Sequence, residues 1–102
     1  MCGMFYNAHK FNKPIDNWNV SGVTNMYSMF DSAYEFNQSI GSWDVSNVTD
    51  MSNMFHNASA FNQDISRWNI NKKVNNNYIE EIYDIFYNCH IYNKYKPAKL
   101  RR

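Results

Sequence analysis

Histidine, cysteine and acidic side chains are the residues of this sequence that could carry catalysis or hold a metal. His9 and His90 match the same position of two separate repeats, whereas His56 falls at another position. No His-x-x-x-His pair or His/Cys cluster occurs, and the aspartates scatter over different repeat positions. Metal sites and catalytic triads need several such groups that converge on one point. We therefore expect no enzyme activity, no metal and no cofactor.

Polar side chains that alternate with apolar ones form a candidate binding face. Around Trp43 and Val45 the intervening side chains should point away from the core. Stacked repeats present such a face to protein partners, and small polar residues suit plain solvation equally well. The candidate residues are Asn17, Asn19, Ser42, Asp44, Arg67 and Asn69.

A period of 25 residues organises the chain and positions these side chains. Tryptophan recurs at this step, as do two phenylalanine positions, an alanine and an isoleucine. A fixed period of about 20–50 residues indicates a repeat architecture, in which each unit buries its apolar face against its neighbours. The predicted core therefore contains Trp18, Trp43, Trp68, Phe30, Phe55, Phe36 and Phe61.

Two local patterns predict one helix and one strand in each unit. Met26, Met29, Phe30 and Ala33 lie at positions i, i+3, i+4 and i+7, which is one face of an α-helix. The pattern I-x-x-W-x-V-x-x-V then shifts to a period near two, which predicts a short strand. Helices are expected over residues 1–8, 24–34, 49–59 and 78–89, and strands over residues 15–20, 40–45 and 65–70.

These elements predict an α/β fold: a leucine-rich-repeat-like solenoid with one short parallel strand plus one helix per 25-residue unit. One repeat domain should cover residues 1–94, and residues 95–102 should form a basic, solvated tail. The units are expected at about residues 1–25, 26–50 and 51–75, followed by a diverged terminal unit at residues 76–94.

Two further repeat positions carry structural predictions. Asn12, Asn37 and Asn62 each follow the loop phenylalanine, so we expect their side chains to bond backbone groups of adjacent units. Cys89 replaces a repeated alanine and should be a small core residue, whereas Cys2 falls at a variable, exposed position. Units that stack at about 4.8 Å would separate the two sulfurs by about 15 Å, so both thiols should be free.

Composition excludes several classes of protein. The net charge is +1 with 19% charged residues, which argues against nucleic-acid binding. No apolar run approaches the roughly 18 residues that a membrane span needs. No signal peptide is visible at the start, so the compartment stays open.

The unit MF-x-x-A-x-x-F-N-Q-x-I-x-x-W-x-V-S-x-V-T-x-M resembles the repeat of BspA-like leucine-rich-repeat surface proteins. The same repeat is found in mycoplasma surface lipoproteins and in large-virus proteins. The resemblance covers residues 1–70 well and residues 78–94 loosely. It implies a solenoid of leucine-rich type and, for some bacterial members, surface display and adhesion to host proteins.

Two functional hypotheses follow. The first is a non-enzymatic module for protein–protein interaction, including adhesion-like surface binding, whose protein partner is unknown. The second is a structural piece of a longer repeat array, whose ends bind neighbouring repeats and could associate end to end. Met1 falls on the repeated methionine, which favours a chain that begins within a unit.

Overall fold

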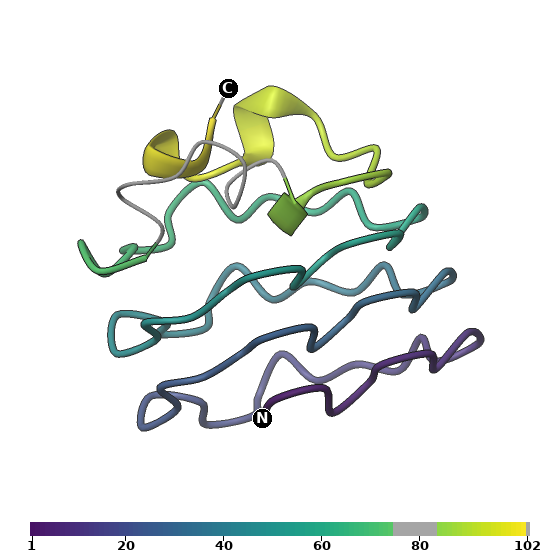
Figure 1. The fold of residues 1–102 in the computed structure, drawn as a ribbon, viewed down its shortest axis with the longest axis horizontal. Helices are drawn as coiled ribbons and strands as arrows, with labels where there is room; N and C mark the ends of the chain where they lie inside the picture. Colours follow the sequence, from purple (N-terminus) through teal and green to yellow (C-terminus); the bar gives the residue numbers. More distant parts are fainter. Residues whose placement is uncertain (75–83, 102) are drawn as a thin grey trace.

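Tight turns make up most of the chain, in place of the expected helices and strands. The computed structural model describes residues 1–74 and 84–101 (Figure 1). Its regular elements are two 3-10 helices, η1 (Asn93–Tyr95) and η2 (Ala98–Leu100). An isolated parallel bridge joins Asn25 to Asp50, and the described ranges contain no strand and no α-helix of seven or more residues. The predicted α/β leucine-rich-repeat-like solenoid is therefore wrong.

Pairs of turns reproduce the spacing that predicted helices. The Met29 N–H donates to the Met26 carbonyl at 3.2 Å, and Ser28, the third residue of this turn, has a φ of 54°. The next turn, residues 30–33, repeats this geometry with a φ of 62° at Ser32. A positive φ at the third position defines a type II turn. Because both ends of each turn point inward, two consecutive turns place apolar residues at i, i+3, i+4 and i+7.

The predicted strands are also turns. The Trp43 N–H donates to the Ile40 carbonyl, and the Val48 N–H donates to the Val45 carbonyl. Each of these bonds closes a four-residue turn where a strand would pair with its neighbour. The predicted inward direction of Trp43 is nevertheless correct, since its side chain is 4% exposed. Residues 78–83 of the predicted helix 78–89 lie outside the described residues, residues 84–85 are helical, and residues 86–89 form another turn.

Consecutive segments of about 25 residues lie one above another (Figure 1). We call residues 1–25, 26–50 and 51–74 the first, second and third tiers. N–H groups of each tier donate to carbonyls of the next, as from Phe5 to Met29 (2.9 Å) and from Phe30 to Met54 (2.8 Å). Alternate N–H groups close turns within the tier, so no continuous strand ladder develops.

Side chains add bonds between the tiers. The Asn12 side-chain oxygen accepts from the Asn37 N–H, and the Asn37 side-chain oxygen accepts from the Asn62 N–H, both at 2.9 Å. These contacts confirm the predicted asparagine ladder. The indole N–H groups of Trp43 and Trp68 donate to carbonyls one tier earlier, those of Ile15 and Ile40. Such bonds satisfy backbone groups that a turn-rich core would otherwise bury unpaired.

Phenylalanine rings form the centre of the core. One column stacks with ring centroids 5.5–5.7 Å apart, and a second column stacks with centroids 5.8 Å apart. Offset stacking at these distances is favourable for aromatic pairs. The first column is Phe5, Phe30, Phe55 and Phe86, and the second is Phe11, Phe36 and Phe61. The result is a compact globule built around an aromatic cluster.

Residues 84–101 cover the far end of this cluster. The Tyr92 N–H donates to the Asn62 side chain, and the Ile65 N–H donates to the Tyr95 carbonyl. Leu100, in η2, is 2% exposed, and the Lys96 ammonium lies over the Phe86 ring at 5.0 Å. The expectation of a solvated tail is therefore wrong for the described part of residues 95–102.

Candidate functional site

The six predicted face residues are all exposed, but several of their side chains bond locally. Asp44 accepts hydrogen bonds from the Ser46 hydroxyl (2.6 Å) and N–H (3.0 Å), and Asn19 accepts the same pair from Ser21. The bonds from Ser46 hold the pKa of Asp44 below its usual value. These two side chains therefore stabilise their own turns.

The other predicted face residues supply little further chemistry. The Ser42 hydroxyl donates to the Asp16 carbonyl at 3.4 Å, which links two tiers. Asn17, Arg67 and Asn69 are exposed. The predicted face is a real polar surface, although it gathers no convergent set of functional groups in the described residues.

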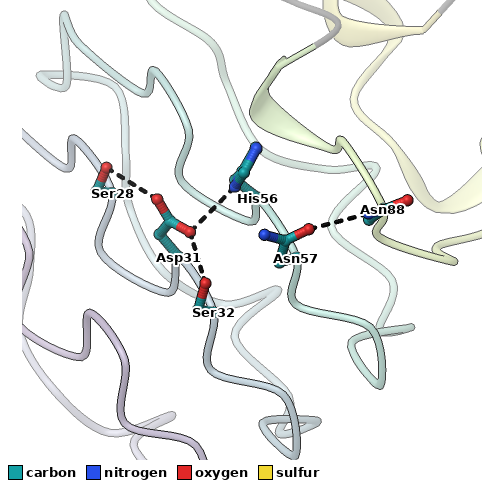
Figure 2. A network of polar contacts seen from close by, with 6 residues as sticks. All are labelled: Ser28, Asp31, Ser32, His56, Asn57 and Asn88. Carbon is teal, nitrogen blue, oxygen red and sulfur yellow. Dashed lines mark hydrogen bonds and ion pairs between the residues drawn. The ribbon is translucent and has the colours of Figure 1, made fainter.

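A different polar cluster surrounds Asp31 (Figure 2). The Asp31 carboxylate accepts hydrogen bonds from the hydroxyls of Ser32 (3.1 Å) and Ser28 (3.5 Å). His56 Nδ1, from the next tier, lies 3.1 Å from the same carboxylate. Ser28, Asp31 and Ser32 are all buried, so these contacts satisfy a carboxylate that solvent barely reaches.

The cluster contains the aspartate–histidine half of a catalytic triad but lacks its other half. A triad needs a nucleophile hydroxyl on the second ring nitrogen of the histidine. Here Ser28 and Ser32 bond Asp31 instead, and in the described part of the chain no hydroxyl bonds His56. The His56 ring stacks on Tyr87 with centroids 5.0 Å apart. The arrangement therefore fixes the position of an aromatic pair.

Aromatic and amide side chains form a second surface, on and beside the paired turns of the tiers. His9 stacks on Tyr34, with ring centroids 4.8 Å apart and planes 25° apart. An open hollow beside this pair is lined by Tyr34, Asn57, Ser59, Asn88 and His90. We call the surface formed by these rings and amides the tyrosine–histidine face. It consists of His9, Tyr34, His56, Asn57, Ser59, Tyr87, Asn88 and His90.

Two asparagines of this face bond each other (Figure 2). The Asn88 side-chain amide donates to the Asn57 side-chain oxygen at 3.0 Å. Both residues have left-handed backbones, with φ values of 55° and 59°, because each is the third residue of a turn. This bond uses the Asn57 oxygen and one Asn88 amide hydrogen, and it leaves the Asn57 amide group and the Asn88 oxygen available. The face therefore offers neutral donors and acceptors beside exposed rings.

Sequence reasoning missed the tyrosine–histidine face. Tyrosine and histidine do recur at related positions, at His9, Tyr34 and His90, and this signal was present. The histidines at this position were considered only as metal ligands or catalytic groups, and Tyr34 was not considered with them. The turns instead bring them onto one side of the molecule.

The two cysteines differ in environment, and both are free as predicted. Cys2 is exposed, whereas the Cys89 thiol lies 3.5 Å from the Phe61 carbonyl oxygen. Burial raises the pKa of the Cys89 thiol to about 11, which disfavours the reactive thiolate. Neither cysteine joins a group of three or more potential metal ligands within the described residues.

Comparisons with known proteins place the chain in a family. No helix in the described residues is long and apolar enough to cross a membrane. Neither the curated proteins nor the solved structures include a match to this chain. Of the resemblances drawn from the sequence, the one to mycoplasma proteins is supported by a family comparison. A model described as Mycoplasma protein of unknown function, DUF285, matches residues 1–96, and the chain belongs to this family.

Proposed function

We propose that the chain is a non-enzymatic module for protein–protein interaction, and that the tyrosine–histidine face makes the contact. One observation carries this proposal: two exposed tyrosines are each held in place by a stacked histidine. Tyr34 is 44% exposed against His9, and Tyr87 is 39% exposed against His56. Tyrosine is enriched in the residues that dominate binding energy at protein interfaces.

Stacking makes these rings suitable for binding. A side chain that is already ordered loses less conformational entropy when a partner covers it, so more of the contact energy appears as affinity. His56 is itself held by Asp31 at 3.1 Å, which extends the ordered set into the core. The adjacent Asn57 and Asn88 provide hydrogen-bonding groups without a net charge. This composition suits a polar protein surface.

The polar cluster supports a binding role more than a catalytic one. Each hydroxyl near Asp31 is bonded to that carboxylate, so neither Ser28 nor Ser32 is activated by His56. The resemblance to BspA-like surface proteins adds adhesion-like surface binding as one form that the interaction could take.

A quantitative pull-down tests the proposal. The intact chain is immobilised, and proteins retained from an extract of the cells that produce it are measured by mass spectrometry. We expect the double variant Tyr34→Lys/Tyr87→Lys to lose at least one retained protein, because the new charges block both stacked rings. The variant Asn17→Ala/Arg67→Ala, on the predicted polar face, should retain that protein.

Thermal denaturation of each variant shows that the fold is intact. Retention that depends on Asn17 and Arg67, and not on the tyrosines, would assign binding to the polar face. Retention that no variant changes, or no specific retention, would contradict the proposal.

A further inference from the structure

One column of side chains in the tyrosine–histidine face lacks a ring at its third member. The column holds the residue that follows the repeated alanine or the cysteine that replaces it, namely His9, Tyr34, Ser59 and His90. His9 stacks on Tyr34 with ring centroids 4.8 Å apart. Ser59, in the next tier, has no ring, and its hydroxyl donates to the Tyr34 carbonyl oxygen at 3.5 Å. The column of rings is therefore interrupted between Tyr34 and His90.

The hollow on this face lies at the interruption. It is lined by Tyr34, Ser59 and His90 of the column and by Asn57 and Asn88 beside it. Its volume is about 190 Å³, which is smaller than the roughly 300–1,000 Å³ of pockets that enclose a drug-sized ligand. Tyr34 and His90 are both exposed, so solvent reaches the hollow. Its size suits one small group of a larger partner.

The aromatic core shows how much room such an interruption leaves. There, Phe55 of the third tier lies between Phe30 and Phe86, with ring centroids 5.5 and 5.7 Å away. These three rings come from the same three segments of the chain as Tyr34, the serine and His90. Rings two tiers apart therefore accommodate one ring between them. The outer column has room for a single stacked ring at the place of the serine.

Two amide groups form the polar wall of the hollow. The bond from the Asn88 amide to the Asn57 oxygen leaves an amide donor on Asn57 and a carbonyl acceptor on Asn88 (Figure 2). Among the described residues that line the hollow there is no aspartate, glutamate, lysine or arginine. A tyrosine hydroxyl both donates and accepts hydrogen bonds, so it can bond both asparagines. The wall favours a neutral ring with a hydroxyl at its edge.

We propose that the hollow binds a tyrosine side chain of a protein partner, whose ring fills the place between Tyr34 and His90 that Ser59 leaves open. The inserted ring stacks on Tyr34, and its hydroxyl bonds Asn57 and Asn88. An aromatic side chain that fills a pocket is a typical anchor of a protein interface. The inference rests on the proposed function, since it identifies the group that the partner brings to the tyrosine–histidine face.

Titration with a small tyrosine derivative, followed by NMR, tests the site directly. The probe is N-acetyl-tyrosinamide, added to the intact ¹⁵N-labelled chain. We expect saturable shifts of the side-chain amide resonances of Asn57 and Asn88, with a Kd of about 1–10 mM, because a single ring makes a small contact. The side-chain amide of Asn47 should not move, since it donates to the Ser21 carbonyl and does not line the hollow.

Two phenylalanine substitutions form a matched pair. Ser59→Phe adds a ring of the chain's own to the interrupted column and should weaken probe binding at least tenfold. Thermal denaturation should show that this variant is at least as stable as the native chain, because the added ring is stacked. Ser42→Phe, at an exposed serine of the predicted polar face, should bind the probe with unchanged affinity. Tyr34→Ala, which removes one side of the hollow, should also weaken binding at least tenfold.

Two other probes test the chemistry of the ligand. N-acetyl-phenylalaninamide lacks the hydroxyl and should bind about two- to tenfold more weakly, since it forms no hydrogen bond with the asparagines. Methyl β-glucopyranoside carries hydroxyls but no aromatic ring, and it should produce no saturable shift. A phenylalanine derivative or a sugar that binds as tightly as the tyrosine derivative would overturn the assignment of tyrosine.

The inference fails if the tyrosine derivative shifts neither asparagine amide, or if Ser59→Phe and Tyr34→Ala bind it as well as the native chain does. The pull-down separates this failure from failure of the proposed function. A protein that Tyr34→Lys/Tyr87→Lys loses but Ser59→Phe retains would contradict the inserted tyrosine and leave the proposed interaction intact. Saturable probe binding with no protein lost by either variant would instead contradict the proposed function, while the hollow still binds tyrosine.

Discussion

The two ends of the aromatic cluster contain the same residue types in different surroundings. Phe5 and Phe86 occupy one column, yet Phe5 is partly exposed and Phe86 lies beneath Lys96. Trp18 and Trp68 differ in the same way, because the Trp68 indole N–H donates to the Ile40 carbonyl, whereas no carbonyl of the described residues accepts from the Trp18 indole. The comparison shows that neighbours decide the burial of each ring, since the local sequence is nearly constant. Stability should therefore depend on position along the stack.

Trp43→Ala should have the largest effect on stability. Its side chain is buried on all sides and its indole bonds the Ile15 carbonyl, so its removal leaves a cavity and an unpaired acceptor. We expect a loss of about 3–5 kcal/mol in the free energy of unfolding. Trp18→Ala should cost less, because Trp18 is already partly exposed and its indole bonds no described carbonyl. Urea denaturation measures both values, and equal losses would contradict the difference between the tiers.

The two cysteines should differ by two orders of magnitude or more in their rate of thiol labelling. With a pKa of about 11, only about a thousandth of Cys89 is ionised at pH 8, and the thiolate is the reactive form. Cys2 is exposed and should react rapidly. Mass spectrometry of the native chain after brief labelling distinguishes the two sites. Rapid modification of Cys89 would show that residues 84–101 do not cover the core.

Leu100→Ala should test the covered end. Leu100 is 2% exposed, so truncation should cost about 2–4 kcal/mol, within the usual range for buried leucine. Met4→Ala, at a side chain that is 52% exposed, is the matched control and should cost less than about 1 kcal/mol, as do most surface changes. Chemical denaturation of both variants gives the comparison. A Leu100 variant as stable as the native chain would remove η2 from the core.

Asp44→Asn should have the smallest effect, visible mainly in acid. The pKa of Asp44 is lowered in the folded chain, so its carboxylate contributes stability above its unfolded pKa, and this contribution is lost as pH falls through the folded pKa. Asparagine can keep both bonds from Ser46, as Asn19 does with Ser21 in the first tier. The variant should match the native chain near pH 7 and unfold with a weaker dependence on pH below about 4. An unchanged acid transition would contradict the role of the Ser46 bonds.

The sequence predicted the register of this molecule better than its elements. The 25-residue step, the inward direction of Trp43 and the asparagine ladder were correct, because stacked identical residues leave a clear periodic signal. The helices were wrong because paired type II turns and one helix face produce the same apolar spacing. Gly3 and Asn53, at the third positions of turns, were the distinguishing signal, since glycine and asparagine tolerate a positive φ.

The candidate site was less predictable. Exposure of the polar face followed from alternation with Trp43 and was correct. The tyrosine–histidine face depends on which turns lie side by side. The structure stacks His9 on Tyr34 and His56 on Tyr87, and the helices expected from the sequence did not predict these pairs. The Asp31 cluster likewise joins residues of two tiers. The spacing of 25 residues between Asp31 and His56 places them at the same repeat position, but it does not show that their side chains bond.

Hydrogen-bond connectivity measured by NMR tests the central claim most directly. Scalar couplings across hydrogen bonds identify which carbonyl accepts from each N–H group. We expect couplings from the Phe5 N–H to the Met29 carbonyl and from the Phe30 N–H to the Met54 carbonyl, with none to the Met4 carbonyl. Couplings from each N–H group to the carbonyl four residues earlier, within residues 26–33, would indicate a helix and contradict it.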